Sequence, residues 1–179
     1  MHGKELTPSE DLTDQIEKAY SEWSQPLSRF ALRLAANRED AEDIVVETFV
    51  EAYRHWSDFK GSGSRQSWLY GIAINRHRMM RRKVKFGTVP LKDELHSTRH
   101  DGTQMIAIEQ EIAKLPIKQR EAFLLVKSEG LTAREAAIVL RRPMGTVLFE
   151  VHQATKALRN ALADEMISVQ LSSVCGVEL

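Results

Sequence analysis

The stretch that decides the fold is EGLTAREAAIVLRRPMGTVLFEVHQATKAL, residues 129–158. Within it, Thr132 is followed three residues later by Glu135, which is a capping box: the two residues satisfy each other's backbone N–H groups at the start of a helix. The pattern predicts a short helix over about 133–140. The packing face of this helix consists of small apolar residues: Ala136, Ala137 and Leu140.

An interruption of the helical pattern and then a longer helix follow. Pro143 and Gly145 interrupt the pattern, and Thr146 is expected to cap a final helix over about 146–165. One buried stripe on that helix is expected from residues at i, i+4, i+7 and i+11: Val147, Val151, Ala154 and Leu158. A short capped helix, a turn and a longer helix form a helix-turn-helix, a motif that lays its second helix in the DNA major groove.

Helical periodicity also covers most of the remaining chain, and no strand alternation is convincing. Pro26 is expected to separate the first two helices, and a Gly/Ser loop, KGSGS, precedes a strongly basic helix. The further predicted helices lie at about 9–23, from after Pro26 to near Asn37, 39–56, within 63–83, 104–114 and 117–128.

The pattern stops between Val84 and about Thr103, where Gly, Pro and mixed charges leave no sustained apolar face. We therefore expect an all-α protein made of two small helical domains joined by a flexible linker, with a helix-turn-helix in the C-terminal one. The expected ranges are an N-terminal domain over 1–83, a linker over 84–104, a C-terminal domain over 105–165 and a C-terminal tail over 166–179.

Composition limits the class of protein. With 179 residues, 42% of them hydrophobic, the chain can build a core, and it has no apolar run long enough to span a membrane. The start has no apolar stretch like that of a signal peptide, so a soluble cytoplasmic protein without membrane insertion is expected. Cys175 is the only cysteine, so no internal disulfide and no thiolate zinc site are possible.

The zero net charge conceals two opposite blocks. Residues 1–58 carry six Lys/Arg against thirteen Asp/Glu, whereas residues 59–83 carry seven Lys/Arg and no acid. Residues 84–179 are balanced, with twelve of each sign. Because a field that attracts an anion repels a cation, this segregation indicates two partners of opposite charge.

Two segments carry a resemblance to a known family. LPIKQREAFLLVKSEGLTAREAAIVLRRPMGTV, with its Leu-Pro, Gln-Arg-Glu, Glu-Gly-Leu and Pro-x-Gly-Thr-Val landmarks, resembles the promoter-binding C-terminal domain of extracytoplasmic-function (ECF, group IV) sigma factors. DAEDIVVETFVEAYRHWSDFKGSGSRQSWLYGIAINRHRMMRR is similar to the N-terminal domain of the same family, in the same order. The resemblance implies a dissociable bacterial RNA polymerase subunit that selects and opens promoters, and that an anti-sigma factor holds until a stress signal arrives.

The resemblance implies a partner for the predicted helix over 39–56, which is rich in acids. This partner is a coiled-coil clamp on the largest subunit of core RNA polymerase. Four acids at i, i+4, i+8 and i+12 form an acidic stripe, which by itself is also typical of a solvated face: Glu39, Asp43, Glu47 and Glu51. One departure from the family is Val46, where a Gln is usual. The expected inward face is Ala41, Val45, Ala52 and Trp56. The implied polymerase-binding residues are Glu39, Asp40, Asp43, Ile44, Glu47 and Glu51.

The basic segment is implied to bind melted promoter DNA at the minus-ten element. Aromatic faces hold unstacked bases and Lys/Arg hold phosphates, while Asn75 has an amide that both donates to and accepts from a base edge. Ordinary core packing is the alternative for Trp68, Leu69 and Ile72. Arg76, Arg78, Arg81, Arg82 and Lys83 are implied to contact phosphate. The full implied set is Phe59, Lys60, Ser62, Ser64, Trp68, Tyr70, Asn75, Arg76, Arg78, Arg81 and Arg82.

The last helix is implied to bind the minus-thirty-five element, yet it lacks the family's usual cations. The DNA-facing positions are Leu148, Phe149, Glu150, His152, Gln153 and Thr155, with a net charge of minus one, which predicts weak upstream binding. Leu148 and Phe149 are expected to meet either a thymine methyl or an apolar protein surface. The implied contact set is Arg134, Arg141, Arg142, Thr146, Leu148, Phe149, His152, Gln153 and Lys156, with Arg159 as a further anchor.

Two classes of function remain open: a working sigma factor, or a sigma-like mimic that occupies a regulator without binding the upstream element. Asn75 and the basic segment favour the first, and the cation-poor last helix favours the second. Neither reading is an enzyme, because GSGSR lacks the P-loop Lys-Ser/Thr and no nucleophile elbow occurs. His96 and His100 have zinc-like spacing but no cysteine pair, so no metal or other cofactor is expected.

Overall fold

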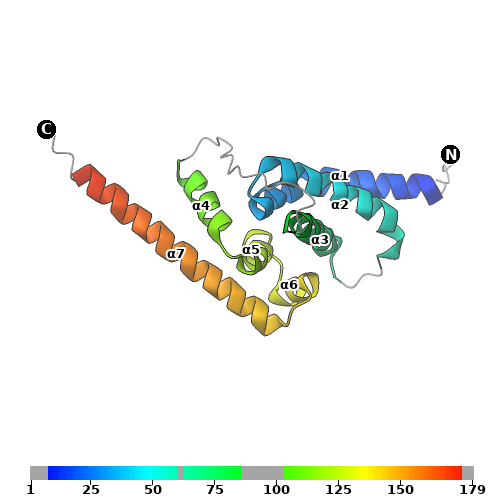
Figure 1. The fold of residues 1–179 in the computed structure, drawn as a ribbon. Helices are drawn as coiled ribbons and strands as arrows, with labels where there is room; N and C mark the ends of the chain where they lie inside the picture. Colours follow the sequence, from blue (N-terminus) through cyan, green and yellow to red (C-terminus); the bar gives the residue numbers. More distant parts are fainter. Residues whose placement is uncertain (1–7, 60–62, 86–102, 175–179) are drawn as a thin grey trace, which may run out of the picture. The chain divides into compact units, whose positions relative to one another are not determined.

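The computed structural model describes the backbone of residues 8–59, 63–85 and 103–174 and the side chains of residues 12–59, 63–82 and 108–163. Every regular element in these ranges is a helix, which confirms the all-α prediction (Figure 1). The chain divides into two compact units, Met1–Leu95 and His96–Leu179. Most of the expected linker, together with Cys175, His96 and His100, lies outside the described residues.

The first helix, α1 (Pro8–Ala35), runs without interruption through Pro26. The prediction of two helices separated at Pro26 is therefore wrong. An interior proline costs about 3 kcal/mol, but burying one Leu or Phe side chain returns about 1.5 to 3 kcal/mol. Ala19 on one side of Pro26 and Leu27 and Phe30 on the other are buried, so packing of the whole face outweighs the lost backbone bond.

Two further helices complete the first unit. α2 (Arg38–His55) begins at Asn37, whose side chain accepts a hydrogen bond from the Asp40 N–H, and it ends in the 3₁₀ turn η1 (Trp56–Asp58). α3 (Arg65–Lys85) packs against both α1 and α2 (Figure 1). The buried residues of α2 and η1 are Ala41, Ile44, Thr48, Phe49, Ala52 and Trp56, so three of the four expected inward residues are buried and Val45 is half-buried.

The start of α3 depends on local chemistry that brings the loop and helix together. The Ser64 hydroxyl accepts from the Ser67 N–H at 3.0 Å, and the Ser67 hydroxyl donates to the Ser64 carbonyl at 2.8 Å. Gly63 has φ +115°, where side chains are strained, and a Cβ there would meet the Ser67 hydroxyl at 3.0 Å. Glycine is therefore required at the point where the loop turns into the basic helix.

The second unit consists of α4 (Thr103–Lys114), α5 (Ile117–Phe123), α6 (Ala133–Leu140) and α7 (Met144–Val174). The π-helical turn η2 (Leu124–Ser128) extends α5, which accounts for the predicted helix over 117–128. α5 and α6 pack on α7. The predicted buried stripe of α7 is confirmed, because Val147, Val151, Ala154 and Leu158 are all buried.

The bounds of α7 differ from the prediction at both ends. The Pro143 carbonyl accepts from the N–H groups of Thr146 and Val147 at 3.0 and 3.1 Å, so the helix starts at Met144. Thr146 lies inside the first turn, and the expectation that it caps the helix is wrong. The backbone stays helical to Val174, past the predicted end near residue 165 and into the expected tail.

The predicted capping box of α6 is present. The Thr132 hydroxyl accepts from the Glu135 N–H at 3.2 Å, and the Glu135 carboxylate accepts from the Thr132 N–H at 2.9 Å and from its hydroxyl at 2.7 Å. The hydrogen bond from the Thr132 hydroxyl, followed by that from its backbone, holds the pKa of Glu135 below its ordinary value. The ionised form of Glu135 is thus the one that stabilises the helix start.

Replacing Thr132 with alanine will lower the melting temperature of the chain at pH 7 by a few degrees. Since the pKa of Glu135 is lowered in the folded chain, its contribution is complete above the ordinary value of about 4.3 and disappears as the pH falls through the lower folded value. Thermal unfolding followed by circular dichroism should show the wild-type advantage shrinking only in acid. Thr146→Ala, at an exposed threonine of α7, is the control, and an equal loss from it would contradict the capping role.

Candidate functional site

The acidic stripe lies on the exposed side of α2. Glu39, Asp43 and Glu47 are exposed, and Glu51 is half-buried. Asp40 is also half-buried, and its carboxylate accepts from the side-chain amide of Asn37 at 2.8 Å. The stripe therefore presents its carboxylates to solvent along the length of the helix.

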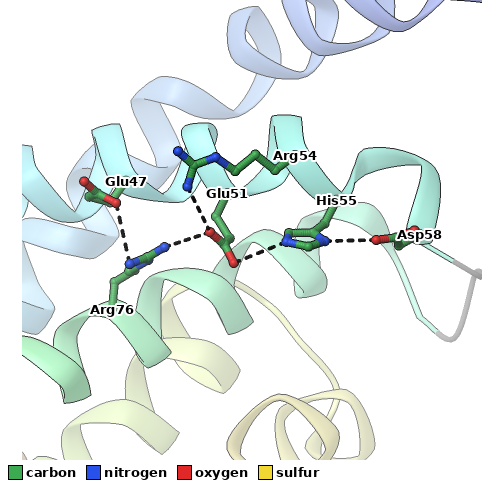
Figure 2. A network of polar contacts seen from close by, with 6 residues as sticks. All are labelled: Glu47, Glu51, Arg54, His55, Asp58 and Arg76. Atoms are coloured by element: carbon green, nitrogen blue, oxygen red, sulfur yellow. Dashed lines mark hydrogen bonds and ion pairs between the residues drawn. The ribbon is translucent and has the colours of Figure 1, made fainter.

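Two carboxylates of this stripe, Glu47 and Glu51, form ion pairs with α3 (Figure 2). Arg76 on α3 reaches Glu51 at 2.8 Å and Glu47 at 3.5 Å, and Glu51 also lies 3.9 Å from Arg54 and 3.6 Å from His55. His55 contacts Asp58 at 2.9 Å. Arg76, expected at DNA phosphate, is thus committed to the acidic helix and ties α3 to α2.

An apolar stripe beside the acids was missed in the sequence. Val46, Val50 and Tyr53 are exposed on α2 at i, i+4 and i+7, and Val46 is 61% exposed. Their helical spacing was the available signal, but the same spacing is typical of a buried face. Only the packing of α1 and α3 shows that this face of α2 points outward in the isolated unit.

Two predicted contact residues lie in the core instead. Ile44, expected at the polymerase, is fully buried between the helices. Tyr70, expected at DNA, is 2% exposed, and its ring centroid lies 4.7 Å from that of Phe30. Neither side chain reaches a partner from these positions, so neither is kept in the contact surfaces proposed below.

The basic helix presents Asn75 and two arginines outward. Asn75, Arg81 and Arg82 are exposed on α3, whereas Arg78 is half-buried. Ser64 is exposed at the cap of the helix. Lys60, Ser62 and the side chain of Lys83 lie outside the described residues. The exposed amide thus shares one helix with cations that can hold phosphate.

An aromatic cluster holds an arginine that was not predicted. The guanidinium of Arg65 stacks 4.2 Å from the ring of Trp56 and 5.4 Å from that of Phe59. The ring of Trp68 lies 5.4 Å from that of Phe59 and 6.0 Å from that of Trp56. The core-packing alternative holds for Leu69, which is buried, and Trp68 and Ile72 are half-buried and pack against the same core cluster. The position of Arg65 is set by rings that come before α3 in the chain, so the cluster is visible only in the folded chain.

A largely buried ion triad, formed by Arg142, Glu121 and Glu150, links the helix-turn-helix to α5. Arg142 donates to Glu150 at 2.8 Å, to the Lys118 carbonyl at 3.1 Å and to Glu121, and its side chain is 15% exposed. The prediction of Arg142 as a DNA contact is corrected, because its guanidinium is turned inward. Glu150, counted among the DNA-facing positions, is 7% exposed and belongs to the same triad.

The outer face of the motif is apolar at the turn and cationic beyond it. Ile138, Met144, Leu148 and Phe149 are exposed. An open surface pocket is lined by Ile138 and Met144 together with Arg134 and Arg141. Thr146, His152, Lys156 and Arg159 are exposed as well, while Gln153 and Thr155 are half-buried. From Met144 to Arg159, the exposed positions of α7 carry no acid.

Replacing Arg142 with methionine will destabilise the second unit by roughly 3 kcal/mol, because Glu121 and Glu150 then stay buried without their cation. Urea unfolding followed by circular dichroism measures this loss. Arg134→Met makes the same exchange at an exposed position of α6 and is expected to change little. Equal effects of the two substitutions would contradict the structural role of the triad.

Two family models match the chain. The model of Sigma-70 region 2 matches residues 19–86, and the model of Sigma-70 region 4 matches residues 105–158. The first range contains the acidic and basic helices, and the second contains the helix-turn-helix. In the described residues, no helix is long and apolar enough to cross a membrane. Nor do the described His, Cys, Asp and Glu residues form a group of three or more that could hold a metal ion.

Individual proteins match most of the chain. The ECF RNA polymerase sigma factor SigE of Mycolicibacterium smegmatis is 30% identical over 146 residues, which cover 75% of this chain and 56% of SigE. The RNA polymerase sigma-H factor of Pseudomonas aeruginosa is 29% identical over 158 residues, which cover 73% of this chain and 77% of that protein. The chain thus spans little more than half of SigE and about three quarters of sigma-H.

A solved structure shares the fold. The sigma factor RpoE from Bartonella quintana, in a co-crystal with the anti-sigma factor NepR, aligns with a TM-score of 0.72 at 22% identity. The alignment covers 83% of this chain and 97% of RpoE.

Proposed function

Because the chain belongs to the extracytoplasmic-function (ECF) RNA polymerase sigma factors, we propose that it directs core RNA polymerase to specific stress-response promoters and helps to open them. The observation that carries this proposal is the pairing, within one unit, of an exposed acidic stripe on α2 with an exposed asparagine on the adjoining basic helix. The chain itself catalyses no reaction in this account. It acts in the cytoplasm, where polymerase and promoter meet.

The polymerase contact is the exposed side of α2. Glu39, Asp43 and Glu47 offer carboxylates to a cationic clamp on the largest subunit, and Glu51 joins them at the edge of the ion network. Val46, Val50 and Tyr53 add an exposed apolar stripe to the same face. Charge steers the encounter, and buried apolar area adds affinity once the helix has docked.

The minus-ten contact is the outer side of α3 with the loop before it. Asn75 reads a base that has left its stack, because an amide both donates and accepts along a base edge. Arg81 and Arg82 hold phosphate, with Arg78 beside them. Arg76 reaches phosphate only after it leaves Glu47 and Glu51. Phe59 and Trp68 supply aromatic surface next to Arg65.

The second unit binds the upstream promoter element through the helix-turn-helix. Arg134, Arg141 and Lys156 are exposed around the motif and are placed at phosphate, and Thr146 and His152 are exposed on α7 as well. Because Glu150 is buried with Arg142, the exposed side of α7 from Met144 to Arg159 carries no acid, although the cations usual in the family are still missing from its DNA-facing positions. The proposed division of the chain is an N-terminal domain over 1–83, a linker over 84–104, a C-terminal domain over 105–165 and a C-terminal tail over 166–179.

Regulation by an anti-sigma factor is part of the proposal. The fold match to RpoE, which was crystallised with its anti-sigma factor NepR, supports such a partner. An inhibitor of this kind would cover surfaces that polymerase and DNA need.

Run-off transcription with purified core polymerase and promoters of the host genome tests the function. We expect transcripts with defined starts only when the chain is added. Core polymerase that binds the chain without initiating at any promoter would contradict the proposal and favour a sigma-like mimic.

A further inference from the structure

The tip of the helix-turn-helix carries an exposed apolar group where a DNA-binding surface is usually polar. Leu148 is 50% exposed and Phe149 is 61% exposed, both in the first two turns of α7. Met144 lies one turn before Leu148, and Ile138 lines the same surface pocket as Met144. Large apolar side chains gathered on a surface mark a binding site rather than chance exposure.

The charges around this group indicate what it binds. Arg134 and Arg141 line the pocket beside Met144, and Lys156 and Arg159 follow on the outer side of α7. Leu148, His152, Lys156 and Arg159 fall at i, i+4, i+8 and i+11, so one exposed stripe passes from apolar to cationic. An apolar centre with cations on both sides complements an anionic groove better than it complements an apolar protein surface.

The position on the helix narrows the target further. In a helix-turn-helix the N-terminal residues of the second helix contact base edges, and flanking residues contact phosphate. The apolar feature that the major groove offers is the thymine C5-methyl group, which contacts apolar side chains. The inward pairing of Glu150 with Arg142 keeps the one acid of this segment away from the groove.

We propose that Leu148 and Phe149 are specificity-determining residues that read thymine methyl groups in the upstream promoter element. The proposal rests on the function given above and adds the chemistry by which the second unit selects its sequence. Leu148 and Phe149 replace hydrogen-bond readout by apolar contact, while Arg134, Arg141, Lys156 and Arg159 supply the phosphate contacts that carry affinity.

Removing only the methyl group tests this proposal. A pool of duplexes with a randomised upstream window is bound by the full chain together with core polymerase, and the enriched sequence is prepared with thymine or with deoxyuridine at each position. Deoxyuridine keeps every hydrogen bond of thymine. We expect one or two positions at which deoxyuridine in place of thymine lowers the affinity about four-fold, because the burial of one methyl group is lost. Leu148→Ala and Phe149→Ala should abolish this difference.

The control and the contrary outcomes are equally specific. Ile108→Ala removes an exposed apolar side chain from α4 and should leave the thymine preference intact. Equal affinity for thymine and deoxyuridine at every position, or no enriched sequence, would overturn the proposal. A loss of transcription in Leu148→Ala without any thymine effect would place a protein on this surface instead. Because run-off transcription is scored separately, methyl-independent initiation would leave the proposed function standing.

Discussion

Replacing Asn75 with alanine will slow open-complex formation roughly five-fold to a hundred-fold, with little change in affinity for core polymerase. The range corresponds to the loss of one base-edge contact, about 1 to 3 kcal/mol. Asn75 is exposed on α3, so the substitution removes an amide without opening a cavity. Stopped-flow fluorescence of a labelled promoter measures the opening rate, and titration of labelled chain with core polymerase measures the affinity.

The matched control for Asn75 is Asn160→Ala, which removes the same amide from an exposed position on α7. It should leave promoter opening unchanged. If Asn75→Ala weakens polymerase binding as much as it slows opening, the residue supports the polymerase contact and not the reading of a base. If both variants behave as the wild type, the flipped base is held elsewhere.

Reversing Asp43 and Glu47 to lysine will abolish co-purification with core polymerase. Two like-charge contacts then replace two attractive ones, and such juxtaposition costs several kcal/mol across an interface, enough to lower affinity at least a hundred-fold. Both carboxylates are exposed, so helicity should survive, as circular dichroism would show. Glu47 also lies 3.5 Å from Arg76, so Asp43→Lys alone tests the stripe with the ion network of Figure 2 intact.

The control for charge alone is the pair Asp14→Lys and Glu17→Lys, two exposed acids on α1. This variant has the same net charge as the reversed stripe and should still co-purify. Retained binding by the Asp43 and Glu47 reversal would mean that the stripe is only a solvated face. Equal loss in both variants would mean that net charge, and not this surface, controls association.

Local signals in the sequence predicted the second unit well. The capping box at Thr132 and the stripe through Val147 and Leu158 depend on residues within a few turns of one another, and both are present as expected. The all-α fold followed in the same way from helical periodicity. The family models and the relatives agree with the resemblance that these segments showed.

Contacts between segments far apart in the sequence determine the features that local patterns did not predict. Pro26 sits inside one helix because α1 packs on other helices on both sides of it: Tyr20 contacts Phe49 of α2, and Phe30 contacts Tyr70 of α3. No local pattern indicates these contacts. Arg142 looked like a phosphate contact, yet Glu121, twenty-one residues earlier, draws it inward together with Glu150. The same holds for Arg76, whose partners lie on another helix. For both arginines the charge was visible in the sequence, but the carboxylates that each one contacts were not.

The central claim is that this chain both joins core polymerase and holds promoter strands apart. Permanganate footprinting measures it directly, because the reagent oxidises unpaired thymines on a promoter identified by run-off transcription. Thymines near the minus-ten element should become reactive with core polymerase and the chain, stay protected with core polymerase alone, and react weakly with Asn75→Ala. A promoter that is bound by the complex but shows no reactive thymine would contradict the account.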